Sequence, residues 1–264
     1  MSDITPIDLT QRLAGKVAVI TGGGSGIGLA TAKRMRAEGA RIVIGDMDPV
    51  SGQAAAEAVE GLFVAVNVTD KDQVDALFDT AAREYGSVDI AFNNAGISPE
   101  DDDSIETTEL PAWEKVQDVN LKSVYLCCRA ALRHMTKQGS GSIINTASFV
   151  AVMGSATSQI SYTASKGGVL AMSRELGVQF ARQGIRVNAL CPGPVNTPLL
   201  QELFASDPER AERRLVHVPV GRFARPEELA ASVAFLASDD ASFITASTFL
   251  VDGGISSAYT TPLA

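Results

Sequence analysis

The chain has 264 residues, of which 45% are apolar and 20% are charged, and its formal net charge is −9. This length suits one large α/β domain or two small domains, and the composition is that of an ordinary globular protein. The negative charge argues against nucleic acid or an anionic membrane as partner, because no broad positive field is available to neutralise phosphates. No apolar run reaches the ~18 residues of a membrane span, and the first residues lack a signal-peptide pattern, so we expect a cytoplasmic protein.

The cysteines and histidines show no metal-binding or disulfide pattern. Cys127 and Cys128 are adjacent, Cys191 is distant, and no C-x-x-C motif occurs. We therefore expect buried thiols in a reducing compartment. His134 and His217 lie far apart without ligand-like neighbours, so we assign no metal ligand.

Short β-branched segments alternate with amphipathic helical segments along the chain. The first half of the chain predicts three strands, at 16–21, 41–45 and 62–66. Each strand is followed by a helix, and these helices lie at 27–38, 50–59 and 71–85. A strand at 88–92, a helix at 112–138, a strand at 142–146 and a helix at 161–183 follow. A strand at 186–190, a helix at 226–236 and a strand at 248–251 complete the series.

Continuous apolar strands, each followed by a helix, are typical of a parallel sheet that is buried on both faces. The predicted fold is α/β: a single doubly wound Rossmann-type domain over residues 1–264, with seven parallel strands and helices on both faces. Within it, residues 1–12 form an N-terminal extension and residues 255–264 a tail that we expect to fray. The irregular, proline-rich residues 192–220 are predicted to be a substrate lid. The acidic residues 98–108 are interpreted as solvated surface, with substrate gating as the alternative.

A glycine-rich segment, TGGGSGIG at residues 21–28, follows the first strand and opens the first helix. Glycines allow a tight turn and a close approach to a pyrophosphate, whose charge is stabilised at a helix N-terminus. The strict G-x-G-x-x-G pattern is not met, and close packing of strand against helix is the alternative role. Its place after a strand favours a dinucleotide site.

Asp46 ends the second strand, 20 residues beyond Gly26. A carboxylate there can accept hydrogen bonds from the adenosine ribose and would repel a 2′-phosphate. Residues 21–28 contain no Lys or Arg to attract that phosphate, so the sequence favours NAD over NADP. The alternative is that Asp46 only begins a turn before Asp48.

Polar groups also follow the next two strands. Asn67 and Val68 end the third strand, where we expect them to flank the adenine, and the NNAG segment at 93–96 ends the fourth. Ligands of open α/β sheets bind at the carboxyl ends of the strands, so all these groups point to one site.

Tyr162 and Lys166 lie four residues apart and would share a helix face. A fixed ammonium near a phenol favours phenolate and lowers the phenol pKa, so Tyr162 could exchange a proton with an alcohol or carbonyl oxygen near neutral pH. Ser148 follows a predicted strand and could donate a hydrogen bond to the same oxygen. Taken alone, a Tyr-x-x-x-Lys pair is commonplace on protein surfaces.

The ordered set of motifs is much more specific, and over residues 13–254 it resembles the short-chain dehydrogenase/reductase family. The set comprises TGGGSGIG, Asp46, NNAG, Asn120, Ser148, the YTASK run at 162–166, PGPVNTP at 192–198 and VDGG at 251–254. Three departures from the family pattern are Asn67 in place of a common Asp, a Ser148-to-Tyr162 spacing one residue longer than usual, and the longer acidic loop.

The resemblance implies a catalytic tetrad. Tyr162 would be the acid/base, Lys166 would lower its pKa and bind the nicotinamide ribose, and Ser148 would orient the substrate oxygen. Asn120 would hold a water that links Lys166 to solvent; a buried structural or helix-kinking amide carries equal weight for Asn120.

The resemblance also implies a cofactor site and a homotetramer. The cofactor residues are Gly22, Ser25, Gly26, Ile27, Gly28, Asp46, Met47, Asn67, Val68, Asn94, Ala95, Gly96, Tyr162, Lys166, Pro192, Gly193, Val195 and Thr197. The tetramer would use the helices at 112–138 and 161–183 and the last strand, and the tail could reach a neighbouring subunit's site.

We therefore predict an NAD(H)-dependent oxidoreductase that interconverts a small secondary alcohol and a ketone. The alternative is a 3-oxoacyl-acyl-carrier-protein reductase that uses NADPH, against which Asp46 and the acidic surface argue. A nucleotide-binding regulator without turnover is a third hypothesis, which the presence of Tyr162 and Lys166 disfavours. The candidate pocket residues are mostly apolar, which predicts a hydrophobic or medium-sized substrate. They are Val150, Met153, Gln159, Pro194 and residues 199–218, with Leu203 and Phe204 on a lid helix.

Overall fold

A computed structural model describes residues 11–155, 157–198, 200–201 and 213–259 of the chain. Seven strands form one parallel sheet in the order β3-β2-β1-β4-β5-β6-β7. The strands are β1 (Val17–Thr21), β2 (Arg41–Asp46), β3 (Leu62–Ala65), β4 (Ile90–Asn93), β5 (Gly141–Thr146), β6 (Ile185–Pro192) and β7 (Thr248–Val251). The order runs outward from β1 in both directions, so the predicted doubly wound parallel sheet is confirmed.

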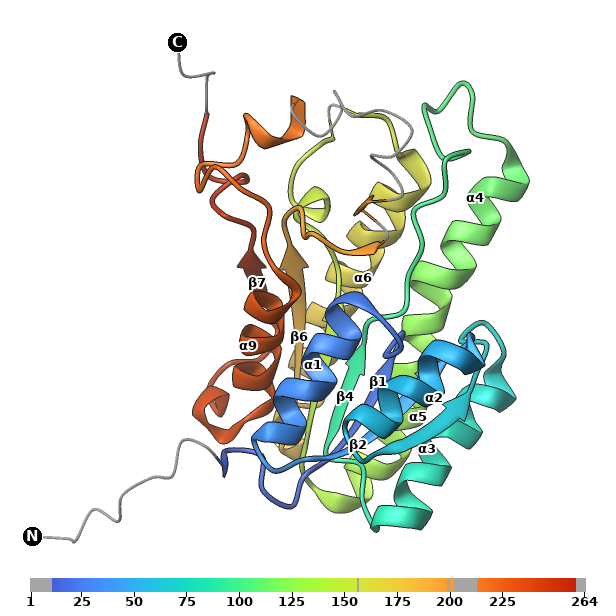
Figure 1. Cartoon of the computed structure of the whole chain (residues 1–264), viewed down its shortest axis with the longest axis vertical. Coiled ribbons are helices and arrows are strands. Elements are labelled where there is room, and N and C mark those ends of the chain that lie inside the picture. Colours follow the sequence, from blue (N-terminus) through green and yellow to red (C-terminus); the bar gives the residue numbers. More distant parts are fainter. Residues whose placement is uncertain (1–10, 156, 199, 202–212, 260–264) are drawn as a thin grey trace, which may run out of the picture.

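Helices cover both faces of this sheet, as Figure 1 shows. They are α1 (Gly26–Ala37), α2 (Pro49–Ala58), α3 (Lys71–Tyr85), α4 (Leu110–Gln117), α5 (Ser123–Gln138), α6 (Ile160–Gln179) and α9 (Pro226–Ala237). Apolar residues of α1, α2 and α9 form one buried cluster with the sheet, and those of α3, α5 and α6 form the other.

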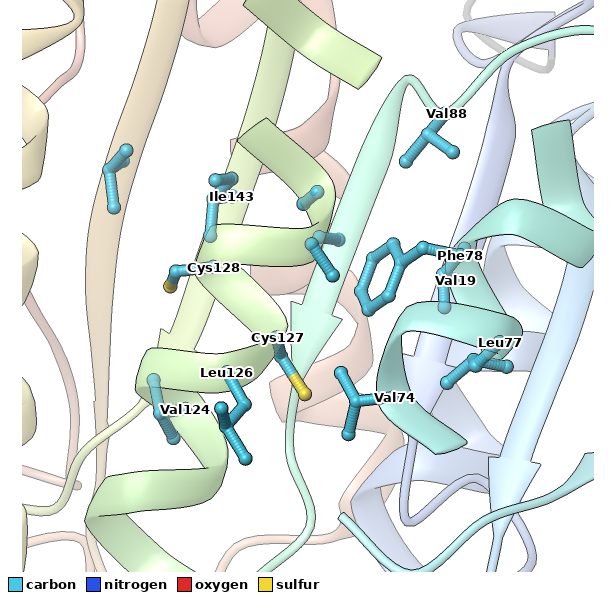
Figure 2. Packing of buried hydrophobic residues seen from close by; sticks show 14 of the residues in the cluster. Val19, Val74, Leu77, Phe78, Val88, Val124, Leu126, Cys127, Cys128 and Ile143 are labelled. Atoms are coloured by element: carbon cyan, nitrogen blue, oxygen red, sulfur yellow. The ribbon is translucent and has the colours of Figure 1, made fainter. Parts of the chain in front are cut away.

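The strands contribute to both clusters because successive side chains point to opposite faces. In β1, Val17 and Val19 belong to the cluster under α3 and α5, whereas Ala18 and Ile20 belong to the cluster under α1 and α9. Figure 2 shows the cluster under α3 and α5, in which Phe78 of α3 packs in the layer between that helix and the sheet. The continuous apolar character of the strands follows from this burial on two sides.

The predicted helix at 112–138 is interrupted. A π-helical turn, Asp118–Lys122, separates α4 from α5 and contains the buried Asn120. The amide of Asn120 bonds to the backbone of Ile97, so the helix opens where a side chain ties it to the loop after β4. A smaller shift occurs at β4, which begins at Ile90; the Val88 backbone before it bonds to the Gln138 side chain.

Some sequence predictions fall outside the described residues. These are residues 1–10 of the extension, residues 199 and 202–212 of the lid with Leu203 and Phe204, and residues 260–264 of the tail. Among the helices that the structure describes, none combines the length and the hydropathy needed to cross a membrane. All three cysteines are buried as free thiols.

Candidate active site

The glycine turn between β1 and α1 allows a ligand to approach its backbone closely. Gly22 and Gly26 have φ values of +63° and +52°, a region that side chains disfavour. A Cβ on Gly28 would lie 2.1 Å from the Gly22 carbonyl oxygen. At the start of α1, the Ser25 side chain caps none of the described N–H groups, and the first turn carries no acidic residue. A helix end of this kind favours a phosphate, so the turn fits the pyrophosphate of a dinucleotide.

Asp46 lies directly against this turn. Its Oδ2 accepts a hydrogen bond from the Gly24 N–H at 2.8 Å, and its Oδ1 accepts one from the Asp48 N–H at 3.1 Å. Both interpretations of Asp46 are thus visible: it begins a turn, and it also presents a carboxylate beside the glycines. Met47 next to it is 74% exposed, which leaves this edge open to an adenosine.

Residues that follow β4 and β6 lie next to the same glycine turn. The Asn94 amide donates to the carbonyl oxygens of Thr21 and Gly22, both at 3.2 Å, and so ties the end of β4 to the glycine turn. After β6, a Cβ on Gly26 would lie 3.4 Å from Thr197 Cγ2, which places the 192–198 segment beside that turn. Val195 in this segment is buried and pairs with Ala224.

The remaining predicted cofactor residues lie on the same edge. Asn67 and Val68 follow β3, and the Asn67 Oδ1 accepts bonds from the backbone and hydroxyl of Thr69. Pro192 ends β6, and the Gly193 N–H donates to the Val251 carbonyl at 3.0 Å. The fold therefore gathers the ends of β1, β2, β4 and β6 around one turn, as expected for a nucleotide site in an open sheet.

The four residues of the implied tetrad converge at the carboxyl ends of β4 and β5. The Lys166 Nζ lies 5.5 Å from the centre of the Tyr162 ring, and Ser148 is close enough to the phenol to lower the pKa of Tyr162. A Cβ on Gly96 would lie 3.2 Å from Asn120 Oδ1 and 3.4 Å from Lys166 Nζ, so these two groups meet at the backbone of NNAG. The four side chains thus form one cluster, although they come from three segments of the chain: the π-helical turn, the end of β5 and α6.

Asn120 acts as a structural amide in this cluster. Its Oδ1 accepts from the Ile97 N–H at 2.8 Å, and its Nδ2 donates to the Ile97 carbonyl at 2.8 Å and to Ser165 Oγ at 3.3 Å. The π-helical turn that presents it is a feature found frequently at functional sites. The structural interpretation that the sequence left open is therefore realised, and the water relay stays a prediction.

The pKa values of Tyr162 and Lys166 differ from what the sequence predicted. Burial raises the pKa of Tyr162, against the opposing effects of the Ser148 hydrogen bond and the Arg214 charge. Burial also lowers the pKa of Lys166 to about 8, and its Nζ donates to the Thr146 carbonyl at 2.8 Å. The predicted lowering of the Tyr162 pKa is not observed, because desolvation penalises phenolate and ammonium alike.

The buried lysine should make stability depend on pH. Between pH ~8 and the ordinary lysine pKa of 10.5 the unfolded chain binds more protons at Lys166 than the folded chain, so the free energy of unfolding should rise with pH in that window. Relative to Lys166→Met, the wild type should gain on the order of 3 kcal/mol across it. Urea unfolding of both proteins without dinucleotide measures this difference; a gap that is constant with pH would contradict the assignment.

One buried acid near the site was not predicted from the sequence. Asp102 lies in the segment interpreted as solvated surface, yet its side chain is buried and accepts bonds from the N–H groups of Ser161 and Tyr162. The interpretation of 98–108 as solvated surface is therefore wrong at this residue. Its partners lie about 60 residues further along the chain, and no local pattern signals such a contact.

Comparison with known proteins agrees with this fold. The family model described as "Enoyl-(Acyl carrier protein) reductase" matches residues 22–256. The chain is 44% identical over 248 residues to cis-4-hydroxycyclohexanecarboxylate dehydrogenase of Sinomonas cyclohexanicum, covering 92% of this chain and 98% of that protein. It is 39% identical to 3-oxoacyl-acyl-carrier-protein reductase FabG of Thermotoga maritima, covering 93% and 99%. The crystal structure of levodione reductase superposes with a TM-score of 0.89 at 37% identity, covering 94% and 100%.

Fold and motif positions thus define a Rossmann-type oxidoreductase. The chain belongs to the short-chain dehydrogenase/reductase family, as the sequence resemblance predicted. Members of this family generally bind a nicotinamide cofactor.

Proposed function

We propose that the chain is an NAD(H)-dependent dehydrogenase that interconverts a secondary alcohol and a ketone, with Tyr162 as acid/base. The observation that carries this proposal is the convergence of Ser148, Tyr162 and Lys166 beside the glycine turn. A proton-transfer group and a dinucleotide cradle at one sheet edge are what hydride transfer at a carbinol carbon requires.

Each residue of the cluster has a separate task in this mechanism. In ketone reduction the Tyr162 phenol donates its proton to the carbonyl oxygen, and in alcohol oxidation the phenolate removes the hydroxyl proton. Ser148 donates a hydrogen bond to the same oxygen and fixes its position. The ammonium of Lys166 stabilises phenolate when Tyr162 has lost its proton.

The glycine turn, Asp46 and the 192–198 segment would hold the dinucleotide. When bound there, a nicotinamide supplies or accepts the hydride. Asp46 would accept hydrogen bonds from the adenosine ribose, and the N-terminus of α1 would face the pyrophosphate. Lys166 would contact the nicotinamide ribose.

We propose a cyclic secondary alcohol as the substrate class. Several relatives are named for ring substrates, among them cis-4-hydroxycyclohexanecarboxylate dehydrogenase, levodione reductase and the cyclohexanol dehydrogenase of Acinetobacter sp.. Val150 and Met153, from the candidate pocket, follow Ser148 and would offer an apolar wall to such a ring. Absorbance of NADH with cyclohexanol, cis-4-hydroxycyclohexanecarboxylate and an acyclic secondary alcohol tests this; turnover of the acyclic alcohol alone would reject it.

Removing the charge of Asp46 should weaken the preference for NAD. Charge-assisted hydrogen bonds contribute about 1.5–3 kcal/mol, so Asp46→Asn should shift the ratio of kcat/KM for NAD against NADP by about 10–100-fold toward NADP. Asp48→Asn is the matched control, because it removes a neighbouring charge while Asn can still cap α2. An unchanged ratio in Asp46→Asn would remove this residue from cofactor selection.

A 3-oxoacyl-acyl-carrier-protein reductase that uses NADPH is the second candidate. The 39% identity to FabG of Thermotoga maritima favours it, whereas the position of Asp46 beside the glycines disfavours a 2′-phosphate. Initial rates with NADH and NADPH on an acetoacetyl thioester and on a cyclic ketone separate the two candidates. A strong NADPH preference together with thioester reduction would reject the NAD-linked proposal.

We also propose the homotetramer that the family resemblance implied. Val178 of α6, Tyr125 of α5 and Phe243 before β7 are exposed apolar side chains in the regions assigned to its interfaces. Light scattering after size-exclusion chromatography measures the mass, and a monomer would reject the proposal. The cytoplasmic location stays a prediction.

A further inference from the structure

The first N–H groups of α6 are satisfied by a loop that is distant in sequence. Gln159, at the N-cap, makes no side-chain capping bond within the described chain. Instead the N–H groups of Ser161 and Tyr162 donate to the two carboxylate oxygens of Asp102, each at 2.8 Å. The Ile160 N–H donates to the Asp103 carbonyl at 3.0 Å. The helix that carries Tyr162 therefore begins on the loop between β4 and α4.

The Asp102 carboxylate is buried at the start of α6. Only 6% of the residue is exposed, and a buried carboxylate is tolerated where hydrogen-bond donors and positive charge surround it. A helix N-terminus supplies both through its free N–H groups and its dipole. Bonds to an ionised acceptor are also stronger than those between neutral groups.

The loop that carries Asp102 is held by hydrogen bonds of its own. The Asp103 N–H donates to Thr108 Oγ1 at 2.9 Å, and Thr107 Oγ1 donates to the Asp103 side chain at 3.1 Å. Asp102 is thus presented by a folded segment that leads into α4. Through Asp102 the acidic stretch provides a fixed anchor, while most of its other side chains are exposed.

Tyr162 is held at both ends of its own backbone. Asp102 accepts from its N–H, and Ser165 Oγ donates to its carbonyl oxygen at 2.7 Å. Ser165 Oγ in turn lies 3.3 Å from Asn120 Nδ2. The backbone of Tyr162 is therefore connected to the π-helical turn on one side and to the 98–108 loop on the other.

We propose that Asp102 is a positioning residue for Tyr162, which fixes the first turn of α6 and thereby the direction of the phenol. The inference rests on the proposed role of Tyr162 in catalysis. Helix ends fray when their free N–H groups lack partners, and Tyr162 lies in the first turn. A displacement of about 1 Å in a reacting group can cost about 10²-fold in rate, so the anchor should matter for turnover.

The test compares Asp102→Ala and Asp102→Asn with the control Asp101→Ala, which removes an exposed carboxylate one residue away. Asp102→Ala should lower kcat by about 10–100-fold and leave the Kd for NADH within about 3-fold. Asp102→Asn keeps one acceptor oxygen and should give an intermediate kcat. Amide exchange, followed by mass spectrometry without cofactor, should become faster in the peptide covering 159–165 for Asp102→Ala and stay unchanged for Asp101→Ala.

The outcomes separate positioning from a structural role. A structural role alone would lower the thermal midpoint but leave kcat per folded molecule within 2-fold of wild type, and that result overturns the proposal. If Asp102→Ala does not fold, Asp102→Asn is judged by the same criteria. If the wild type turns over no alcohol or ketone, the proposed function fails; the exchange measurement then still tests the anchor, and unchanged exchange overturns it.

Discussion

Replacing Tyr162 by phenylalanine is expected to lower kcat by about 10²–10⁴-fold, the range that general acid–base catalysis contributes. The substitution removes the phenolic oxygen beside Ser148 and keeps the ring that lies 5.5 Å from Lys166 Nζ. Because the glycine turn and Asp46 are untouched, the Kd for NADH should stay within a few-fold of wild type. Steady-state rates with a cyclic alcohol and NAD, together with the fluorescence of bound NADH, measure both quantities.

Tyr125→Phe provides the matched control, since it removes a phenol from an exposed tyrosine on α5. Its kcat should equal that of the wild type. Turnover at the wild-type rate in Tyr162→Phe would exclude Tyr162 as the proton-transfer residue. A joint loss of NADH binding and turnover would instead show that the ring is needed to build the cofactor site.

Replacing Gly28 by alanine is expected to abolish cofactor binding. The new Cβ would lie 2.1 Å from the Gly22 carbonyl oxygen and 3.0 Å from Asn94 Nδ2, so the backbone of the turn must shift. The N–H groups that we propose bind the pyrophosphate would shift with it. Loss of one or two charge-assisted bonds, at about 1.5–3 kcal/mol each, corresponds to about a 10- to 10⁴-fold rise in the Kd for NADH.

Gly167→Ala is the control for this substitution, because no described atom lies within 4 Å of a Cβ at that position of α6. Alanine there should stabilise the protein by up to about 1 kcal/mol and leave NADH binding intact. Titration of both variants with NADH, next to thermal unfolding, separates loss of affinity from loss of folding. A folded Gly28→Ala protein with wild-type affinity would show that this turn does not hold the cofactor.

Local pattern alone was enough to predict the sheet, and the family resemblance of the ordered motifs singled out the cluster. The apolar strands and their helices predicted seven parallel strands, and the range of α3 was predicted to the residue. Ser148, Tyr162 and Lys166 could be found because the first follows a strand and the others share one helix face, and those positions depend on neighbours in the chain. The strand ends predicted that the cofactor residues would gather at one edge, because parallel strands place their carboxyl ends together.

Contacts between distant segments decided what the sequence left undetermined. The break in the helix at Asn120 depends on Ile97, the burial of Asp102 depends on the start of α6, and the raised pKa of Tyr162 depends on desolvation by the segments around it. Periodicity reports which face of an element is apolar, and it holds no information on which buried polar group meets which backbone amide. Sequence thus determined the family and the fold of this protein, and the tertiary structure decided how its tyrosine is held, because desolvation and long-range hydrogen bonds exist only once the chain has folded.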